Sequence, residues 1–146
     1  MFIQSAFIRK NSPYLQEKLK EMGYKTDSTS VNTGCIATSS THDSFTVIDE
    51  SRFDSINPHV TWNNGDRIDC GNNEELFLAI SALRDDTNDH QWFIAQDTMW
   101  DENYNGEITV YFEEGEWLQW DYYSLMEDMP SYFRKATLEE IIKHFS

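Results

Sequence analysis

One short segment has side chains that could bind a calcium ion. Asp101, Asn103 and Asn105 offer oxygen atoms at alternate positions, as the first three ligands of an EF-hand loop do. Gly106 follows them and could supply the sharp turn of such a loop, but the twelfth position is Phe112 where an EF-hand has a glutamate. Asn-Gly before an alternating apolar run also predicts a β-hairpin turn, which needs no metal. We therefore expect a hairpin, with calcium binding as the alternative.

A zinc site and a reactive thiol both find little support. The residues that could form a two-cysteine, two-histidine set are Cys35, His42, His59 and Cys70. Their spacing lacks the closely paired ligands of structural zinc sites, and two cysteines are too few for a secreted disulfide scaffold. We therefore expect two buried, reduced thiols, and neither a metal nor another cofactor.

Signatures of an enzyme are weak. The sequence has no Gly-x-Ser-x-Gly elbow, no P-loop and no Gly-x-Gly-x-x-Gly segment. His42 and Asp43 lie beside Ser39 and Ser40, but a hydroxyl-rich loop produces such neighbours by chance. Paired carboxylates with aromatic platforms would suit glycoside hydrolysis, yet the chain has so many acids that no pair stands out. We predict no catalytic residue and keep a carbohydrate-binding or glycoside-hydrolysing module as an alternative.

The strongest signal is an acidic stretch that is also rich in aromatic residues. Between Arg84 and Arg134 the chain has thirteen acids, no Lys or Arg, and twelve aromatic residues. The rings argue against a disordered acidic tail and favour acids laid over a folded sheet. Acids without intervening cations repel one another, and such a surface attracts a basic partner. The stretch is therefore either a solvated sheet face or a contact surface for the basic surface of another protein, where its carboxylates would imitate nucleic-acid phosphates.

The predicted contact residues lie within 97–128 and supply charge and anchoring rings. For charge they are Asp101, Glu102, Glu113, Glu114, Glu116 and Asp121, and for anchoring they are Trp117 and Trp120. Large rings are the usual anchors of protein interfaces. Trp100, Tyr122 and Tyr123 are further anchors if they are exposed.

Caps, turns and apolar spacing predict the elements that position these residues. Helices are expected from Ser12 to Gly23, from Asn72 or Asn73 to Asp85, and from Thr137 to the last residues. Strands are expected at 2–8, 35–38, 45–49, 91–95, 108–112 and 116–122, with mostly loop over 51–65. The predicted fold class is α+β: a single domain, 1–146, with a mainly antiparallel sheet and two to three helices packed on it.

Length and composition fit that fold and exclude several classes. The chain has 146 residues, 39% of them hydrophobic, which is enough for one core. A net charge of −15 argues against direct binding to nucleic acid or to a membrane surface. No run of 18 apolar residues is present and the first residues do not form a secretory signal, so we expect a soluble cytoplasmic protein.

Four segments carry a resemblance to a known group. They are residues 7–24, 70–86, 90–93 and 135–145. They resemble small uncharacterised proteins of phages and prophages of gut bacteria. The resemblance implies a phage accessory protein that acts in the host cytosol and disables a host factor, and it assigns no site residue. The region 97–133 lies outside these segments and coincides with the acidic stretch.

The leading hypothesis is a non-catalytic binding protein, an accessory inhibitor of a host defence or nucleic-acid-handling protein. The second is a protein that sequesters a nucleotide messenger of host defence. Such a site needs stacking rings and a few cations, and the candidate cations are Arg9, Lys10, Arg52, Arg67 and Arg84.

Overall fold

The computed structural model describes residues 1–26, 34–48, 67–120 and 132–146. These ranges contain three helices and ten strands, and most strand pairs are antiparallel, so the predicted α+β class is confirmed. No helix among the described residues has both the length and the apolar character needed to cross a bilayer.

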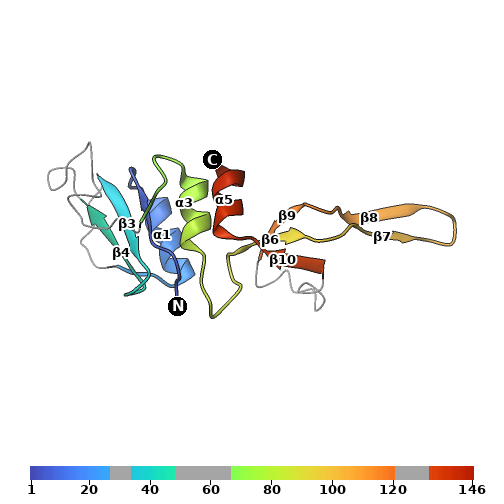
Figure 1. Ribbon diagram of the computed structural model, residues 1–146, viewed down its shortest axis with the longest axis horizontal. Helices are drawn as coiled ribbons and strands as arrows, with labels where there is room; N and C mark the ends of the chain where they lie inside the picture. Colours follow the sequence, from blue (N-terminus) through green and yellow to red (C-terminus); the bar gives the residue numbers. More distant parts are fainter. Residues whose placement is uncertain (27–33, 49–66, 121–131) are drawn as a thin grey trace.

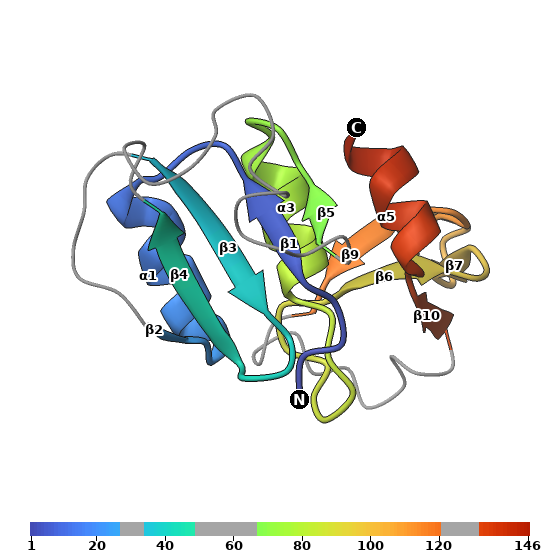
Figure 2. The same ribbon diagram turned by 60° about the vertical axis from the view of Figure 1, so that its left-hand side comes forward.

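A five-stranded sheet forms one end of the molecule. In spatial order its strands are β2 (Lys25–Thr26), β4 (Ser44–Ile48), β3 (Cys35–Ser39), β1 (Ala6–Ile8) and β5 (Ile68–Asp69). The β1–β3 and β3–β4 pairs are antiparallel, whereas β2–β4 and β1–β5 are parallel. Helices α1 (Pro13–Met22) and α3 (Glu74–Ser81) cover one face of this sheet (Figures 1 and 2). Leu15 and Phe77 of these helices are fully buried in the core.

The predicted helix starts are confirmed. Ser12 caps α1 and Asn73 caps α3, each accepting a hydrogen bond from the backbone N–H three residues on. Thr137 begins α5 (Leu138–Phe145) with a reciprocal capping box. Helix α3 ends at Ser81, before the predicted Asp85, because the following residues pair with the start of the chain: Leu83 accepts from Ile3 N–H and the Asp85 N–H donates to Met1.

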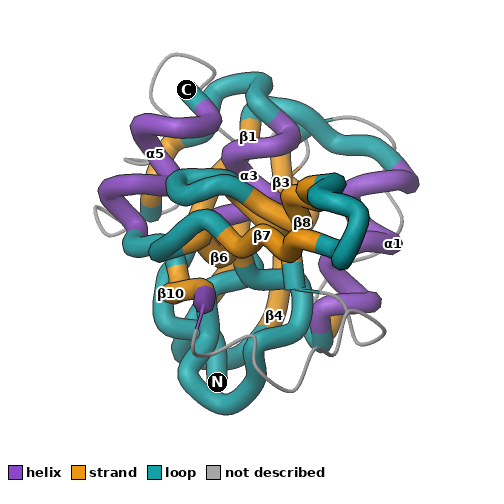
Figure 3. Tube along the Cα trace, turned by 90° about the vertical axis from the view of Figure 1, so that its right-hand side faces the viewer, coloured by secondary structure: helices purple, strands orange, loops and turns teal. Residues whose placement is uncertain are grey.

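A second, smaller sheet lies beyond α5. It is antiparallel, in the order β10 (Phe133–Lys135), β6 (Trp92–Ala95), β9 (Trp117–Gln119). Beyond it, β7 (Met99–Glu102) and β8 (Ile108–Phe112) form a hairpin that projects away from the rest of the molecule (Figure 1). Figure 3 looks at the molecule from this end, with the hairpin in front of the other elements. We call residues 97–116 the arm and the remaining described residues the body.

The strand predictions are confirmed in part. The hairpin around Asn105-Gly106 is present, although its loop spans 103–107 and is longer than a tight two-residue turn. The strand predicted at 2–8 is shorter, and Phe2 forms only an isolated bridge to Arg84. Strands β2, β5 and β10 were not predicted, since strands this short carry no periodic pattern, and β7 was implied only as the first strand of the predicted hairpin. The loop predicted over 51–65 lies outside the described residues.

Candidate functional site

The arm exposes an unusual amount of apolar surface. Every residue from 100 to 111 is exposed. The large hydrophobic ones are Tyr104 (98% exposed), Ile108 (64%), Trp100 (57%), Tyr111 (57%) and Val110 (50%). Single exposed apolar residues are ordinary, but a group on one projecting element indicates an interaction surface.

The strand register gives the arm two distinct faces. Trp100 pairs with Val110, and Glu102 pairs with Ile108. Cross-strand partners point to the same side of a hairpin, and alternate residues of one strand share a face. One face therefore carries Trp100, Ile108 and Val110 with a single carboxylate. Asp101 pairs with Thr109 on the opposite face.

The loop of the arm is held by a single asparagine. The Oδ1 atom of Asn103 accepts hydrogen bonds from the N–H groups of Asn105 (2.9 Å) and Glu107 (3.0 Å). Gly106 adopts φ +83°, a left-handed conformation that suits glycine. One of the three side-chain oxygens of the calcium alternative thus takes part in forming the turn. The described residues contain no group of three or more His, Cys, Asp or Glu that could hold a metal ion.

The arm is fixed to the body at its base. Phe112 is buried, and its ring centroid lies 4.6 Å from that of Phe133 and 5.9 Å from that of Tyr132. Met99 packs against the same cluster, and the register shifts between Met99 and Trp100, as at a β-bulge. Among the described residues, the packing of buried side chains therefore stops at the bulge, and the pairing of the two strands supports the hairpin beyond it.

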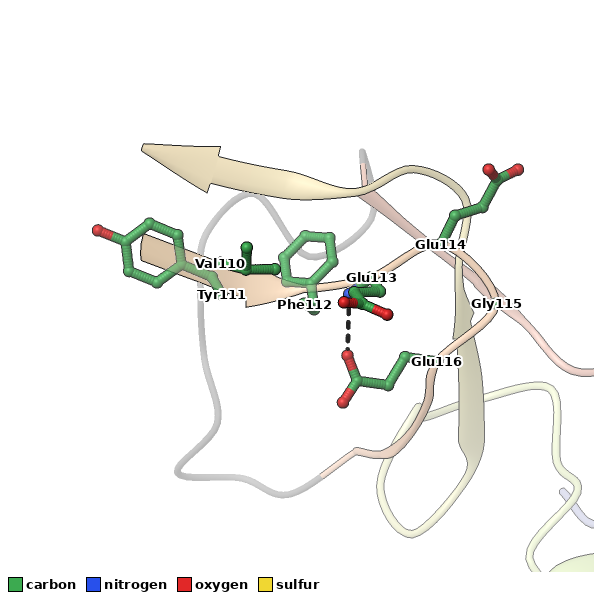
Figure 4. A pocket seen from close by; sticks show the side chains of 7 residues that line it. All are labelled: Val110, Tyr111, Phe112, Glu113, Glu114, Gly115 and Glu116. Carbon is green, nitrogen blue, oxygen red and sulfur yellow. Dashed lines mark hydrogen bonds between the residues drawn. The ribbon is translucent and has the colours of Figure 1, made fainter. Parts of the chain in front are cut away.

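Three carboxylates gather where the chain leaves the arm. The Glu113 N–H donates to Oε2 of Glu116 (3.0 Å), and the Glu114 N–H donates to Oγ1 of Thr98 (3.1 Å). Residues 110–116 line an open hollow of about 550 Å³, and in Figure 4 the Glu114 side chain points away from the other two carboxylates. The structure thus places the predicted contact residues Asp101 and Glu102 along the arm and these three at its base.

Ion pairs distinguish several acids of the body, among them Asp69, Glu74 and Glu140, from the acids of the arm. In the part of the chain that the structure describes, no salt bridge involves an acid of residues 97–116. The arm itself contains seven acids and no Lys or Arg. Its negative charge is therefore not compensated by these neighbours.

Two predicted anchors pack inside the body. Trp117 is half-buried and stacks on His144, with ring centroids 3.9 Å apart. Trp120 is also half-buried and lies 5.1 Å from the ring of Phe93. Both rings thus take part in packing and are only partly exposed, so their role as anchors stays a prediction. Asp121 lies outside the described residues.

The exposed rings of the arm are those of Trp100, Tyr104 and Tyr111. Sequence reasoning named Trp100 only as a further anchor and missed the two tyrosines. The signal that could have found them is the run Ile108-Thr-Val-Tyr-Phe112. It is apolar on both faces next to a hairpin turn, and a two-stranded hairpin has nothing to cover both faces.

The cations proposed for a nucleotide site are scattered and have partners in the body. The ion pairs are Arg9 with Asp69 (2.8 Å), Lys10 with Glu74 (2.6 Å) and Arg84 with Asp86. Arg67 is partly buried and donates to the backbone oxygen of Thr38, and Arg52 lies outside the described residues. Hydrogen bonds from Arg84, and then from the Met1 amino group, hold the pKa of Asp86 well below its usual range. These contacts join elements of the fold.

The two cysteines are buried and unbonded to each other, as predicted. Burial raises the pKa of the Cys70 thiol to about 12, so the thiolate that a nucleophile needs is scarce at neutral pH. His59, one of the four residues considered for zinc, lies outside the described residues.

A separate cleft of about 350 Å³ opens between α1, α3 and β6. Its walls include Tyr14, Lys18, Glu75, His90, Trp92 and Phe145. It combines rings with one ammonium and one carboxylate, and this mixture favours no single ligand charge.

Comparisons of the chain with protein-family models, with curated proteins and with solved structures give no match.

Proposed function

We propose that the protein is a non-catalytic binding protein whose arm docks on the basic surface of a partner protein. The observation that carries this proposal is the combination, on one projecting hairpin, of exposed rings with carboxylates that form no salt bridge among the described residues. Either feature alone has an ordinary explanation, since charged loops and single exposed rings are common. Together they describe a surface that is suited to a partner with cations around an apolar patch.

The two kinds of side chain would do different work in such a complex. Removal of apolar surface from water contributes about 25 cal/mol per Å², and rings are the usual centres of binding energy. The face with Trp100, Ile108 and Val110 would supply this favourable free energy of burial. The carboxylates would speed encounter with a basic partner and reject acidic ones. A second copy of this chain is disfavoured as the partner, because the same acids would then face each other.

The resemblance to phage and prophage proteins supports a narrower form of the proposal. The arm would occupy a functional surface of a host protein of defence or nucleic-acid handling and block it. Docking of this kind needs no catalytic group on the chain.

The nucleotide-sequestering and carbohydrate alternatives gain no comparable support. Arg9, Lys10 and Arg84 form salt bridges with acids of the body. The open hollow at the base of the arm has three glutamates in its lining, which disfavours an anionic ligand there.

The test compares two variants with the same change in charge. The arm variant is Asp101→Asn, Glu102→Gln and Glu113→Gln, and the body variant is Glu17→Gln, Glu75→Gln and Glu139→Gln. Each protein is used to capture partners from a lysate of gut bacteria, and the affinity of any captured protein is then measured against salt. We expect the arm variant alone to lose at least about ten-fold in affinity.

Salt provides the second readout. The wild-type affinity should fall as salt rises from about 0.05 to 0.3 M, because screening shortens the reach of exposed charges. A captured protein that binds the arm variant as tightly as the wild type, with no salt dependence, would contradict the proposal.

A further inference from the structure

Rings and carboxylates are interleaved along the arm. Trp100 is followed by Asp101 and Glu102, and Tyr104 stands at the tip, almost fully exposed. On the return strand Tyr111 is exposed, and Glu113 and Glu114 follow it after the buried Phe112. An extended rod thus offers flat rings and negative groups in succession.

Single-stranded nucleic acid presents the same two groups. Its phosphates run along the backbone, and its bases are free to stack on protein rings. In a duplex the bases are stacked inside, and proteins contact mainly phosphates and the base edges in the grooves. A mimic of a duplex therefore needs carboxylates without protruding rings, whereas a mimic of a single strand needs both.

We infer that the arm imitates a single nucleic-acid strand and that its partner is a protein groove that binds single-stranded DNA or RNA. This inference rests on the proposed function and names the class of partner. Grooves of this class combine cations that follow the backbone with aromatic platforms that stack bases. The cations would pair with the arm carboxylates, and the platforms would receive the rings of Trp100, Tyr104 and Tyr111.

The shape of the arm agrees with such a groove. Its two strands are paired directly, and neighbouring β-strands lie only about 4.8 Å apart, so the arm is a narrow ribbon. Residues 100–111 project beyond the last packed side chains and are exposed on both faces. A narrow ribbon can enter a groove and be contacted from both sides, as a single strand is.

The test is competition with labelled nucleic acid. Fluorescent oligo(dT) is bound to each of two probe proteins, a bacterial single-stranded-DNA-binding protein with an OB fold and a cold-shock domain. A labelled operator duplex is bound to a helix-turn-helix repressor. We expect the protein to displace oligo(dT) from at least one of the first two probes and to leave the operator on the repressor.

A ring variant and a control variant test whether the exposed rings of the arm are needed for competition. The ring variant is Trp100→Ser, Tyr104→Ser and Tyr111→Ser, and its control is Tyr14→Ser, an exposed ring of the body. We expect the ring variant to compete about ten-fold or more weakly, since each stacked ring contributes substantially to single-strand binding. The Tyr14→Ser control should compete like the wild type.

Three results would overturn the inference. They are displacement of the operator as efficient as that of oligo(dT), displacement of oligo(dT) from neither single-strand probe, and equal competition by the ring variant. In each case the proposed function still stands if the arm variant, with Asp101→Asn, Glu102→Gln and Glu113→Gln, binds a captured basic partner more weakly than the wild type does. The proposed function itself fails if the arm variant binds the captured partner as tightly as the wild type does.

Discussion

The arm and the body differ in how they treat negative charge. In the body, several acids at the ends of elements are paired: Glu74 with Lys10, Asp69 with Arg9, and Glu140 with Arg134. Within residues 1–26, 34–48, 67–120 and 132–146, no such bridge reaches an acid of the arm. Among the described residues, the chain thus pairs part of its negative charge in the body and none in the arm.

The body also buries more apolar side chains than the arm does. Helix α3 buries Leu76, Phe77 and Ile80, whereas β8 buries only Phe112. An isolated two-stranded hairpin is only marginally stable in water. The arm therefore adds little to the stability of the folded protein. The difference indicates that most of the buried packing lies in the body and that the arm contributes little to it.

The largest expected effect is the difference in the free energy of unfolding between a variant that lacks a core ring and one that lacks an arm ring. Phe77→Ala should lower the free energy of unfolding by about 3–5 kcal/mol, because it removes a fully buried ring. Trp100→Ala should change it by no more than about 0.5 kcal/mol. Urea denaturation of both variants measures the contrast. A loss from Trp100→Ala close to that from Phe77→Ala would show that the arm is part of the cooperative core.

Two glycines give the next contrast. Gly23 has φ +115°, and a Cβ atom there would lie 3.0 Å from Nη1 of Arg84, which itself donates to the backbone oxygen of Met22. Gly23→Ala should therefore lower the free energy of unfolding by about 1 kcal/mol or more. Gly106→Ala is strained too, but an added Cβ there has no neighbour within 4 Å.

For Gly106→Ala we expect faster amide hydrogen exchange in the arm and little change in global unfolding. The measurement is hydrogen exchange by NMR together with urea denaturation. Equal losses of global stability in the two glycine variants would argue against an energetically separate arm.

Acid stability tests the pairing in the body. Hydrogen bonds from Arg134, and then from the Thr137 backbone, lower the pKa of Glu140 from 4.5 to about 2. Because the folded pKa lies below the unfolded one, this contribution is present above pH 4.5 and is lost as the pH falls towards 2.

The variant Glu140→Gln should therefore be less stable near neutral pH, by up to about 1 kcal/mol, and should lose less stability between those two pH values. Thermal unfolding across this range measures the effect. An unchanged acid profile would mean that the pair does not contribute to the fold.

The smallest effect concerns the arm acids. The variant Asp101→Asn, Glu102→Gln and Glu113→Gln should change the free energy of unfolding by a few tenths of a kcal/mol, in the stabilising direction, because it relieves repulsion on an exposed element. Its melting temperature should rise slightly as a result. A clear destabilisation would show that these carboxylates support the fold.

Local signals predicted much of the architecture. Ser12, Asn73 and Thr137 are caps whose hydrogen bonds depend on residues within one turn, and Asn105-Gly106 indicates a hairpin by itself. Strand β5 could not be foreseen, because it forms by pairing with β1, far away in the sequence.

The site was predictable as a charge pattern but not as a shape. Trp100, Trp117 and Trp120 have similar acidic and aromatic neighbours in the sequence, so no local rule shows which ring is covered. His144 and Phe93 cover two of them, and these contacts arise from the tertiary fold.

The proposed contact surface for a partner is the arm. Hydrogen exchange of the protein alone and saturated with its captured partner tests this claim most directly. If the arm contacts the partner, hydrogen exchange of the backbone amides should slow on binding across 99–112 and should be unchanged in α1 and α3. Slowing around the cleft of Tyr14 and Trp92, with unchanged exchange across the arm, would contradict it.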